Sequence, residues 1–271
     1  MMRAEYEDIQ SGGAPVFGES SAGGAERMAL AGVAVEDCRG EDIIARLGDV
    51  VARGDFLRLA FLNAHCVNLA RRDEAYRKAL ARCVVLPDGI GVDLGAQLLH
   101  GRKFAENLNG TDFVPRFFRE AKTPLKIGLV GGAPGVAVKA ADTLRSALPE
   151  HEFVAVSDGF FGEAGRDAVL VRLEEGQFDV VLVAMGVPAQ ERFMVEHLDA
   201  RHGRILIGVG ALFDFLAGNV ARAPLAVRKL RLEWAWRLGL EPSRLWRRYV
   251  LGNPLFIAEI LRDRLTPRSV R

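Results

Sequence analysis

The chain has 271 residues, of which 49% are hydrophobic, and its formal net charge at neutral pH is +1. No apolar run reaches the roughly 18–20 residues that a transmembrane helix requires, and the acidic N-terminus lacks the basic and apolar regions of a signal peptide. The three cysteines show no CxxC spacing, so neither a disulfide framework nor a zinc site is indicated, and a cytoplasmic protein is expected.

Residues 1–28 are rich in Gly, Ala, Ser and Glu without apolar periodicity, which predicts a flexible tail. From residue 29 to residue 220, strands and helices alternate. The first two helices are predicted at 40–54 and 65–81. Strands, most with their following turns, are predicted at 28–35, 56–64, 83–87, 124–135, 152–162, 178–191 and 204–218. This alternation is typical of an α/β fold with a Rossmann-like, mostly parallel sheet and helices on both faces.

Polar and glycine residues follow the predicted strands at the points where the strands end. In parallel sheets, ligands bind beyond the carboxyl ends of the strands, and these ends share one edge. The residues at this edge are Asn63, Asp88, Gly131, Gly132, Gln190, Glu191 and Gly210. Together they indicate a pocket for a nucleotide or a sugar phosphate.

Asp88 follows the apolar run "CVVLP" and is followed directly by Gly89. A loop carboxylate beside apolar side chains can have a raised pKa and act as a general base. The alternative is a helix N-cap, since Asp is favoured there. Asp93 is better placed to start the next helix, which weakens this alternative, but the local pattern leaves both open.

The turn "VGGAPG", which contains Gly131 and Gly132, would let the backbone approach a phosphate at a helix N-terminus. It matches neither GxGxxG nor GxxxxGK[ST], so an ordinary turn is the alternative. Gln190 in "GVPAQE" offers donors and acceptors for sugar hydroxyls, or simply lies in the first turn of a helix. The chain has no Asp-x-Asp, so a metal cofactor is not expected.

The C-terminal segment is basic and aromatic. After residue 220 lie 12 of the 36 Lys and Arg residues, only 4 of the 35 acids, and all three tryptophans, Trp234, Trp236 and Trp246. Arg244, Arg247 and Arg248 are predicted to share one helical face. This composition favours an anionic membrane surface over nucleic acid, for which no motif is present. A solvated helix pair is the alternative reading of residues 221–271.

Taken in order, several stretches resemble the WecG/TagA/CpsF glycosyltransferase family (glycosyltransferase family 26). Each stretch is weakly specific by itself, but the ordered set, which spans about residues 30–256, is highly specific. The stretches are "LNAHCVNLA", "LPDGIGV", "NGTDFVP", "GGAPGV", "VAMGVPAQE", "GVGALFDFLAG", "RAP" and "LEWAWRLGLEPSRLWRRY".

The resemblance implies an inverting, metal-independent bacterial enzyme that transfers a sugar from a UDP-sugar to a polyprenyl-diphosphate-linked saccharide. Its place is the inner face of the cell membrane, in polysaccharide biosynthesis. Asp88 matches the catalytic aspartate, and residues 29–220 become the catalytic core. The expected substrate-binding residues are Asn63, Gln190, Glu191, Gly131, Gly132, Gly210 and three appendage arginines, Arg237, Arg244 and Arg247.

Two positions depart from the family pattern. Phe61 stands where a Thr is frequent, and Asn107 stands where an Arg is common. The sequence leaves the donor sugar open among N-acetylmannosamine, its uronic acid and glucose, and it leaves open whether the chain forms a homo-oligomer. The alternative functions are a non-catalytic UDP-sugar-binding protein and a membrane-associated scaffold.

Overall fold

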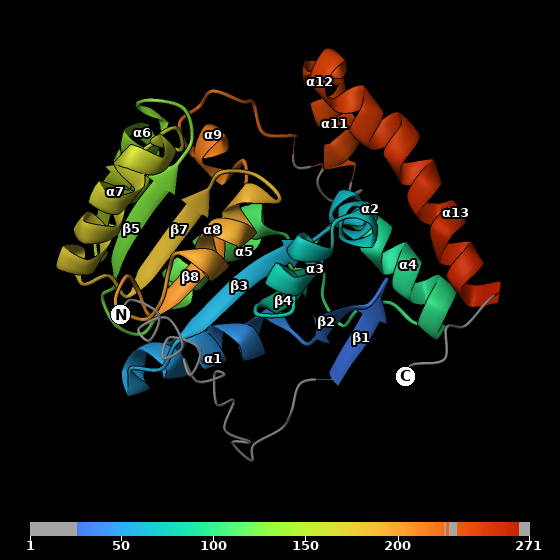
Figure 1. Cartoon of the computed structure of the whole chain (residues 1–271), viewed down its shortest axis with the longest axis horizontal. Helices are drawn as coiled ribbons and strands as arrows, with labels where there is room; N and C mark the ends of the chain where they lie inside the picture. The colour runs from blue at the N-terminus through green and yellow to red at the C-terminus, as the bar shows by residue number, and fades with distance from the viewer. Residues whose placement is uncertain (1–25, 225, 228–231, 266–271) are drawn as a thin grey trace, which may run out of the picture.

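Six parallel strands form the central sheet of the computed structural model, which describes residues 26–224, 226–227 and 232–265 (Figure 1). The strand order is β4-β3-β8-β7-β5-β6. The strands are β3 (Leu57–Leu62), β4 (Val84–Pro87), β5 (Lys126–Gly131), β6 (Glu152–Ser157), β7 (Val180–Ala184) and β8 (Ile205–Gly208). The predicted parallel sheet is confirmed, and all six carboxyl ends point to one edge.

Helices cover both faces of this sheet because successive side chains of each strand point to opposite faces. Leu57, Leu59 and Phe61 enter one core, whereas Ala60 and Leu62 enter another. The first face is covered by α1 (Gly40–Arg53), α5 (Gly110–Glu120), α6 (Val136–Ala147) and α9 (Leu212–Leu216). The second face is covered by α2 (Ala64–Arg72), α3 (Glu74–Leu80), α4 (Ile90–His100), α7 (Gly162–Gly176) and α8 (Ala189–Glu196).

The first predicted strand, 28–35, is wrong as a single strand. The chain reverses there into an antiparallel hairpin of β1 (Glu26–Leu30) and β2 (Val33–Asp37). Ala31 and Gly32 make the turn with φ angles of 53° and 78°, the left-handed pair that a type I′ hairpin turn requires. β1 begins at Glu26, so its first residues belong to the predicted tail, and residues 1–25 lie outside the described residues.

The predicted helix 65–81 is likewise two helices, α2 and α3, which meet at Asp73. The Asp73 carboxylate accepts a hydrogen bond of 2.9 Å from the Tyr76 backbone N–H and so caps α3. The apolar periodicity continues through this break, and for that reason the periodicity alone did not reveal it.

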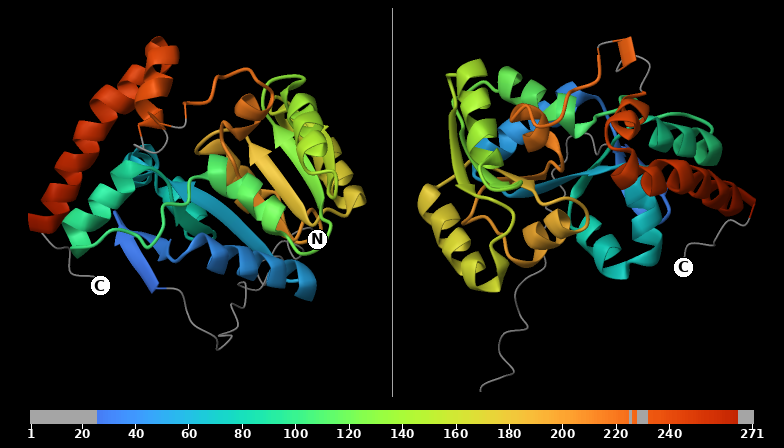
Figure 2. Two further views of the ribbon diagram at one scale, coloured as in Figure 1. Left: turned by 180° about the vertical axis from the view of Figure 1, so that it is seen from behind. Right: turned by 90° about the horizontal axis from the view of Figure 1, so that it is seen from above.

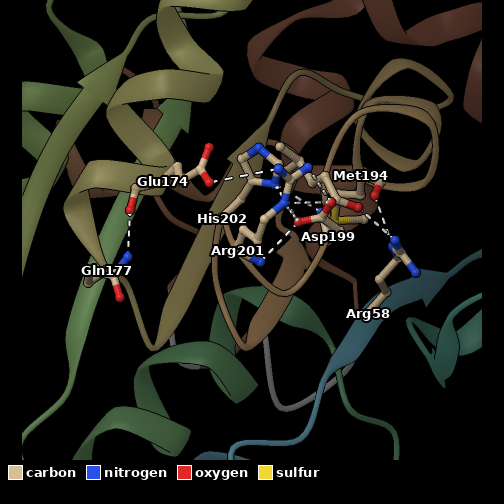
Figure 3. A network of polar contacts seen from close by, with 8 residues as sticks. Arg58, Glu174, Gln177, Met194, Asp199, Arg201 and His202 are labelled. Atoms are coloured by element: carbon tan, nitrogen blue, oxygen red, sulfur yellow. Dashed lines mark hydrogen bonds and ion pairs between the residues drawn. The ribbon is translucent and has the colours of Figure 1, made fainter.

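A polar network fixes the amino end of the sheet, on the edge opposite the predicted site. The guanidinium of Arg58, on β3, donates to the carbonyl oxygens of Met194 and Leu198 at 2.9 and 2.7 Å (Figure 3). In the same region Asp199 accepts hydrogen bonds from Arg201. These contacts tie α8 to the start of β3 and hold the sheet without using its carboxyl edge.

The C-terminal appendage consists of α11 (Glu233–Leu240), α12 (Pro242–Trp246), the π-helical turn η1 (Arg247–Leu251) and α13 (Gly252–Leu265). α13 packs along α2 and α4 (Figures 1 and 2). Phe256 and Ile260 are 1% and 0% exposed and belong to the same core as these helices. Within the described residues, no helix is both long enough and apolar enough to span a bilayer.

Candidate active site

A cavity of about 340 Å³ lies at the carboxyl ends of β3 and β4 and is closed on one side by the appendage. Its walls come from five parts of the chain: the turn after β3, the turn after β4 with the start of α4, the segment 107–112, Phe215 beyond β8, and the appendage helices. Three of the predicted site residues, Asn63, Asp88 and the appendage residue Arg237, line it.

Asp88 is placed by the end of β4, where its backbone N–H donates to the Leu62 carbonyl oxygen at 2.9 Å. It does not cap α4, because the N-cap is Gly89, with a φ of 86° and no side-chain hydrogen bond at the cap. Burial raises the pKa of the Asp88 carboxyl, while a hydrogen bond from Asn63 and the charges of Arg248 and Arg237 oppose that rise. The carboxyl lines the cavity, and its raised pKa means that it binds a proton more strongly than an exposed aspartate does.

Asn63 holds one orientation because its side chain caps α2. Its Oδ1 atom accepts the backbone N–H groups of His65 and Cys66, both at 3.1 Å. The Nδ2 group is consequently directed toward the carboxylate of Asp88, at 3.4 Å from Oδ2. A residue that begins a helix thus also orients the candidate base.

Asn107 binds the loop that carries Asp88. Its Oδ1 accepts the Gly89 N–H at 2.8 Å, and its Nδ2 donates to the Gly89 carbonyl at 2.9 Å. Asn107 also lines the cavity. The departure from the family pattern at this position therefore has a local function: it fixes the backbone beside the candidate base.

Phe61, the other departure, is 8% exposed and is not part of the cavity wall. Its ring packs edge-on against Phe113 at 6.2 Å between centroids. A Cβ atom at Gly110 would lie 2.9 Å from this ring. The aromatic side chain thus fills core space next to α5, and glycine at position 110 makes room for it.

The appendage arginines are used unequally. Arg237 and Arg248 line the cavity, and their guanidinium groups stack over Phe215 and Tyr249 at 5.3 and 5.4 Å. Of the predicted arginines, Arg244 instead pairs with Glu241, and Arg247 stacks over Trp246 at 5.5 Å. Neither of these two lines the cavity.

Two acids and one histidine also belong to the polar lining. Glu233 and Asp112 line the cavity, and burial raises the pKa of the Glu233 carboxyl, as do the charges of Asp112 and Asp88. Burial and the charge of Arg248 lower the pKa of His65 to about 4, so its imidazole is neutral at physiological pH. Sequence reasoning did not select Glu233, because its place in the cavity depends on how the appendage folds back.

Gln190 and Glu191 lie beneath the end of β8, outside the cavity wall, and are 3% and 0% exposed. Gln190 Oε1 accepts the Gly210 N–H at 3.0 Å, while its Nε2 donates to Glu191 Oε1 at 2.8 Å. Burial raises the pKa of Glu191 to about 7. In this conformation both side chains and the Gly210 N–H form hydrogen bonds inside the protein.

Gly131 and Gly132 lie at the end of β5, in the other half of the sheet, and do not line the cavity. Gly131 has a φ of 127°, and a Cβ there would lie 2.4 Å from the Ala184 carbonyl oxygen. That carbonyl accepts the Gly132 N–H at 2.8 Å. The glycines thus permit close approach of the β5 and β7 backbones, and phosphate binding by them stays a prediction.

Among the described residues, no group of three or more His, Cys, Asp or Glu side chains is arranged to hold a metal ion. The cavity thus combines a carboxylate of raised pKa with two guanidinium groups. A carboxylate and two guanidinium groups at the carboxyl edge of a parallel sheet are compatible with a transferase that acts on a phosphate-bearing substrate.

The chain belongs to the Glycosyl transferase WecG/TagA/CpsF family, whose sequence profile matches residues 28–270. It is 30% identical over 207 residues to an N-acetylglucosaminyldiphosphoundecaprenol N-acetyl-beta-D-mannosaminyltransferase of Bacillus subtilis (strain 168), covering 76% of this chain and 79% of that protein. It is 30% identical over 179 residues to a protein of the same name from Bacillus spizizenii, covering 66% of this chain and 68% of the relative. The chain is therefore a glycosyltransferase.

Proposed function

We propose that this enzyme transfers an N-acetylmannosamine-type sugar from a UDP-sugar to a saccharide carried on a polyprenyl diphosphate, in the synthesis of a cell-surface polysaccharide. The names of both relatives describe transfer of N-acetylmannosamine to an N-acetylglucosamine diphosphate lipid. The observation that carries the proposal is the carboxylate of Asp88 in the cavity. Asn63 hydrogen-bonds to this carboxylate, and Asp88 is not the N-cap of α4.

In the proposed mechanism Asp88 removes the proton from the acceptor hydroxyl as that oxygen attacks the anomeric carbon of the donor. The C–O bond to the nucleotide diphosphate breaks in the same step, so the configuration inverts and UDP leaves with the electron pair. A raised pKa suits this role because the carboxylate then binds the proton more strongly. Asn107 keeps the Gly89 backbone, and with it Asp88, in place.

Negative charge on the diphosphates calls for cations, and Arg237 and Arg248 supply two guanidinium groups in the cavity. Guanidinium is well suited to bidentate phosphate binding. We therefore expect transfer to proceed without a divalent metal. The UDP moiety is expected at the ends of β5, β7 and β8, where Gly131, Gly132 and Gly210 lie.

The appendage also provides the surface proposed to meet the membrane. Trp246, Val250 and Leu251 are 42%, 53% and 55% exposed, and the same elements, α12 and η1, carry Arg244, Arg247 and Arg248. Exposed apolar side chains among cations favour an interface with anionic lipid headgroups. This is where a lipid-linked acceptor would be delivered.

The test is a transfer assay with radiolabelled UDP-N-acetylmannosamine and a polyprenyl-diphosphate N-acetylglucosamine acceptor, run with and without EDTA. We expect label in the lipid product, the same rate in EDTA, and an inverted anomeric configuration. UDP-glucose and the UDP-uronic acid serve as competing donors. If the protein bound these donors but transferred sugar from none of them, the result would contradict the proposal and favour a non-catalytic binding protein.

A further inference from the structure

The lining of the active-site cavity combines two chemistries. Asn63, Asp88 and Asn107 contribute polar side chains. Apolar side chains of α4 and the appendage, which together are called the apolar wall, also line it: Ile90, Leu94, Trp234, Phe256 and Ile257. The aliphatic side chains of Ile90, Leu94 and Ile257 offer no hydrogen-bond partner to the hydroxyl groups of a sugar.

Ile90 and Leu94 start this apolar wall next to the candidate base. Ile90 is two residues from Asp88 and opens α4. Leu94 follows one turn later, on the same side of the helix and about 6 Å further along its axis. Both side chains line the cavity, yet they are 43% and 44% exposed. Two large apolar side chains thus remain accessible within a binding cavity.

The opposite side of the apolar wall is firmly held. Phe256 is 1% exposed, and a Cβ atom at Gly95 would lie 2.8 Å from its ring, so α13 packs closely on α4. Asn68 adds a hydrogen bond of 2.8 Å to the Gly252 carbonyl. The two helices that carry Leu94 and Ile257 are therefore held together by packing in the folded structure.

A lipid-linked acceptor joins three chemistries in a row: a saccharide, a diphosphate and an apolar chain. The cavity holds the same three, with amides and a carboxylate, the guanidinium groups of Arg237 and Arg248, and an apolar wall. Other exposed apolar residues, such as Val250 and Leu251, lie outside the cavity lining. The apolar wall is thus distinct from the surface proposed to meet the bilayer.

We propose that Ile90, Leu94 and Ile257 form a subsite for the first isoprene units of the acceptor, the units attached directly to its diphosphate. The subsite rests on the proposed function and adds to it that the enzyme binds part of the lipid chain itself. Ile90 and Leu94 are then specificity-determining residues: they distinguish a prenyl diphosphate from a diphosphate with a small substituent.

The test uses soluble acceptors, without detergent or vesicles, so that membrane binding cannot contribute. N-acetylglucosamine diphosphate is esterified either to a methyl group or to a two-isoprene geranyl chain. For the wild-type enzyme we expect kcat/KM for the geranyl acceptor to exceed that for the methyl acceptor by at least about tenfold, given the apolar area removed from water. The difference should lie mainly in KM, because the chain is remote from the reacting atoms.

The variants Leu94→Ser and Ile90→Ser should each reduce this preference severalfold, whereas Leu94→Met should retain it. Val171→Ser on α7 is the matched control, since Val171 is an exposed apolar helix residue, 52% exposed, outside the cavity. The control should keep the wild-type preference. Circular dichroism and thermal unfolding verify that each variant is folded.

Equal use of both acceptors by the wild type would overturn the subsite while leaving the proposed function intact. A geranyl preference that survives in both Ser variants would also overturn it. The subsite would fail as well if the wild type were a dimer that Leu94→Ser separated into monomers without changing the preference. That result would mean that a second copy of the chain covers this wall. If the wild type transferred sugar to neither acceptor and not to the natural-length lipid, the proposed function itself would fail.

Discussion

The side-chain amide of Asn63 holds the carboxylate of the candidate base, Asp88, through a hydrogen bond. Asn63 uses its oxygen to cap α2, so only its nitrogen is directed toward Asp88. A hydrogen bond to the carboxylate favours the charged form, whereas burial favours the neutral form, and burial is the larger effect. The balance leaves Asp88 more basic than an exposed aspartate.

Replacing Asp88 by Asn keeps the shape of the site and removes the base. We expect kcat to fall by about 10²–10⁴-fold, the usual contribution of a general base. The wild-type rate should fall as pH decreases through the raised pKa, because the protonated carboxyl cannot accept a proton. Steady-state transfer rates across pH test this, and an Asn variant with wild-type kcat would exclude Asp88 as the base.

Glu191 gives a prediction about stability. Its pKa is raised from 4.5 to about 7 by burial, so between these values the folded state binds a proton that the unfolded state has lost. Stability therefore falls as pH rises through this window, by roughly 3 kcal/mol. The neighbouring thiols of Cys66 and Cys83 have pKa values of about 11 and 12 and the pKa of the Tyr76 hydroxyl is raised further, so they do not titrate in this window.

The variant Glu191→Gln removes the charge and keeps an acceptor for Gln190. Urea unfolding at pH 5 and pH 8 should show a smaller loss of stability with pH in this variant than in the wild type. Glu163→Gln, at an exposed position of α7, should behave like the wild type. An unchanged pH dependence in Glu191→Gln would show that this carboxyl is ionised alike in the folded and unfolded chains.

Sequence patterns identified individual site residues where a strand end fixes the position of a side chain. Asn63 and Asp88 follow directly on β3 and β4, which are paired in register, so their proximity follows from the parallel sheet. Gln190 and Glu191 also follow a strand, but a strand end does not reveal whether a side chain turns outward or beneath the neighbouring strand. The sequence did not show that Arg248 lines the cavity while Arg244 and Arg247 do not, because this difference depends on the geometry of the π-helical turn η1.

At the scale of elements, the segment between α4 and α5 determines where the candidate base stands. Asn107 forms two hydrogen bonds with the Gly89 backbone, and the Leu108 N–H donates to the Pro87 carbonyl at 2.8 Å. Both contacts hold the turn after β4. This segment therefore acts as a brace for the loop between β4 and α4.

Asn107→Ala should weaken this brace. We expect a loss of about 1–3 kcal/mol in unfolding free energy from two backbone contacts, and a fall in kcat of about tenfold as Asp88 gains freedom. Asn107→Asp keeps the acceptor for the Gly89 N–H and loses the donor, so its effect should be intermediate. Activity and stability equal to the wild type in the Ala variant would contradict this role.

Element boundaries were harder to predict than element types. The strands were recognised because Val, Ile and Leu fill both faces of a covered parallel sheet. The hairpin of β1 and β2 was missed because its turn, Ala31–Gly32, lies inside an apolar run and lacks the Asn-Gly or Asp-Gly signal. The break at Asp73 was missed because the periodicity of α2 carries on into α3.

For the whole molecule, the appendage is integral to the fold. Its basic and aromatic composition predicted a surface role, yet Phe256 and Ile260 are buried against α2 and α4. Nothing in the local sequence of α13 shows which of its apolar residues would be buried. The α/β sheet was predictable from periodicity, whereas this long-range packing was not.

Phe256→Ala should cost about 3–5 kcal/mol in unfolding free energy, because it leaves a cavity in a packed core. The control is Leu265→Ala at the end of the same helix, where the side chain is 82% exposed and the expected change is below about 0.5 kcal/mol. Urea denaturation measures both. A small effect of Phe256→Ala would mean that α13 is not docked in solution.

Membrane binding is expected to depend on the outer surface of η1. Leu251→Glu places a like charge against anionic lipid and should reduce flotation with anionic vesicles at least severalfold. Val171→Glu, on the remote helix α7, should float like the wild type. Flotation unaffected by Leu251→Glu would place the membrane contact elsewhere.

The cavity takes its walls from residues as distant in the chain as Asn63 and Ile257. α13 follows every strand of the sheet in the chain, so a polypeptide cut before Gly252 keeps Asp88 but lacks this part of the cavity wall. We expect such a fragment to bind a lipid-linked acceptor more weakly, because Asn253, Phe256 and Ile257 are missing from its cavity.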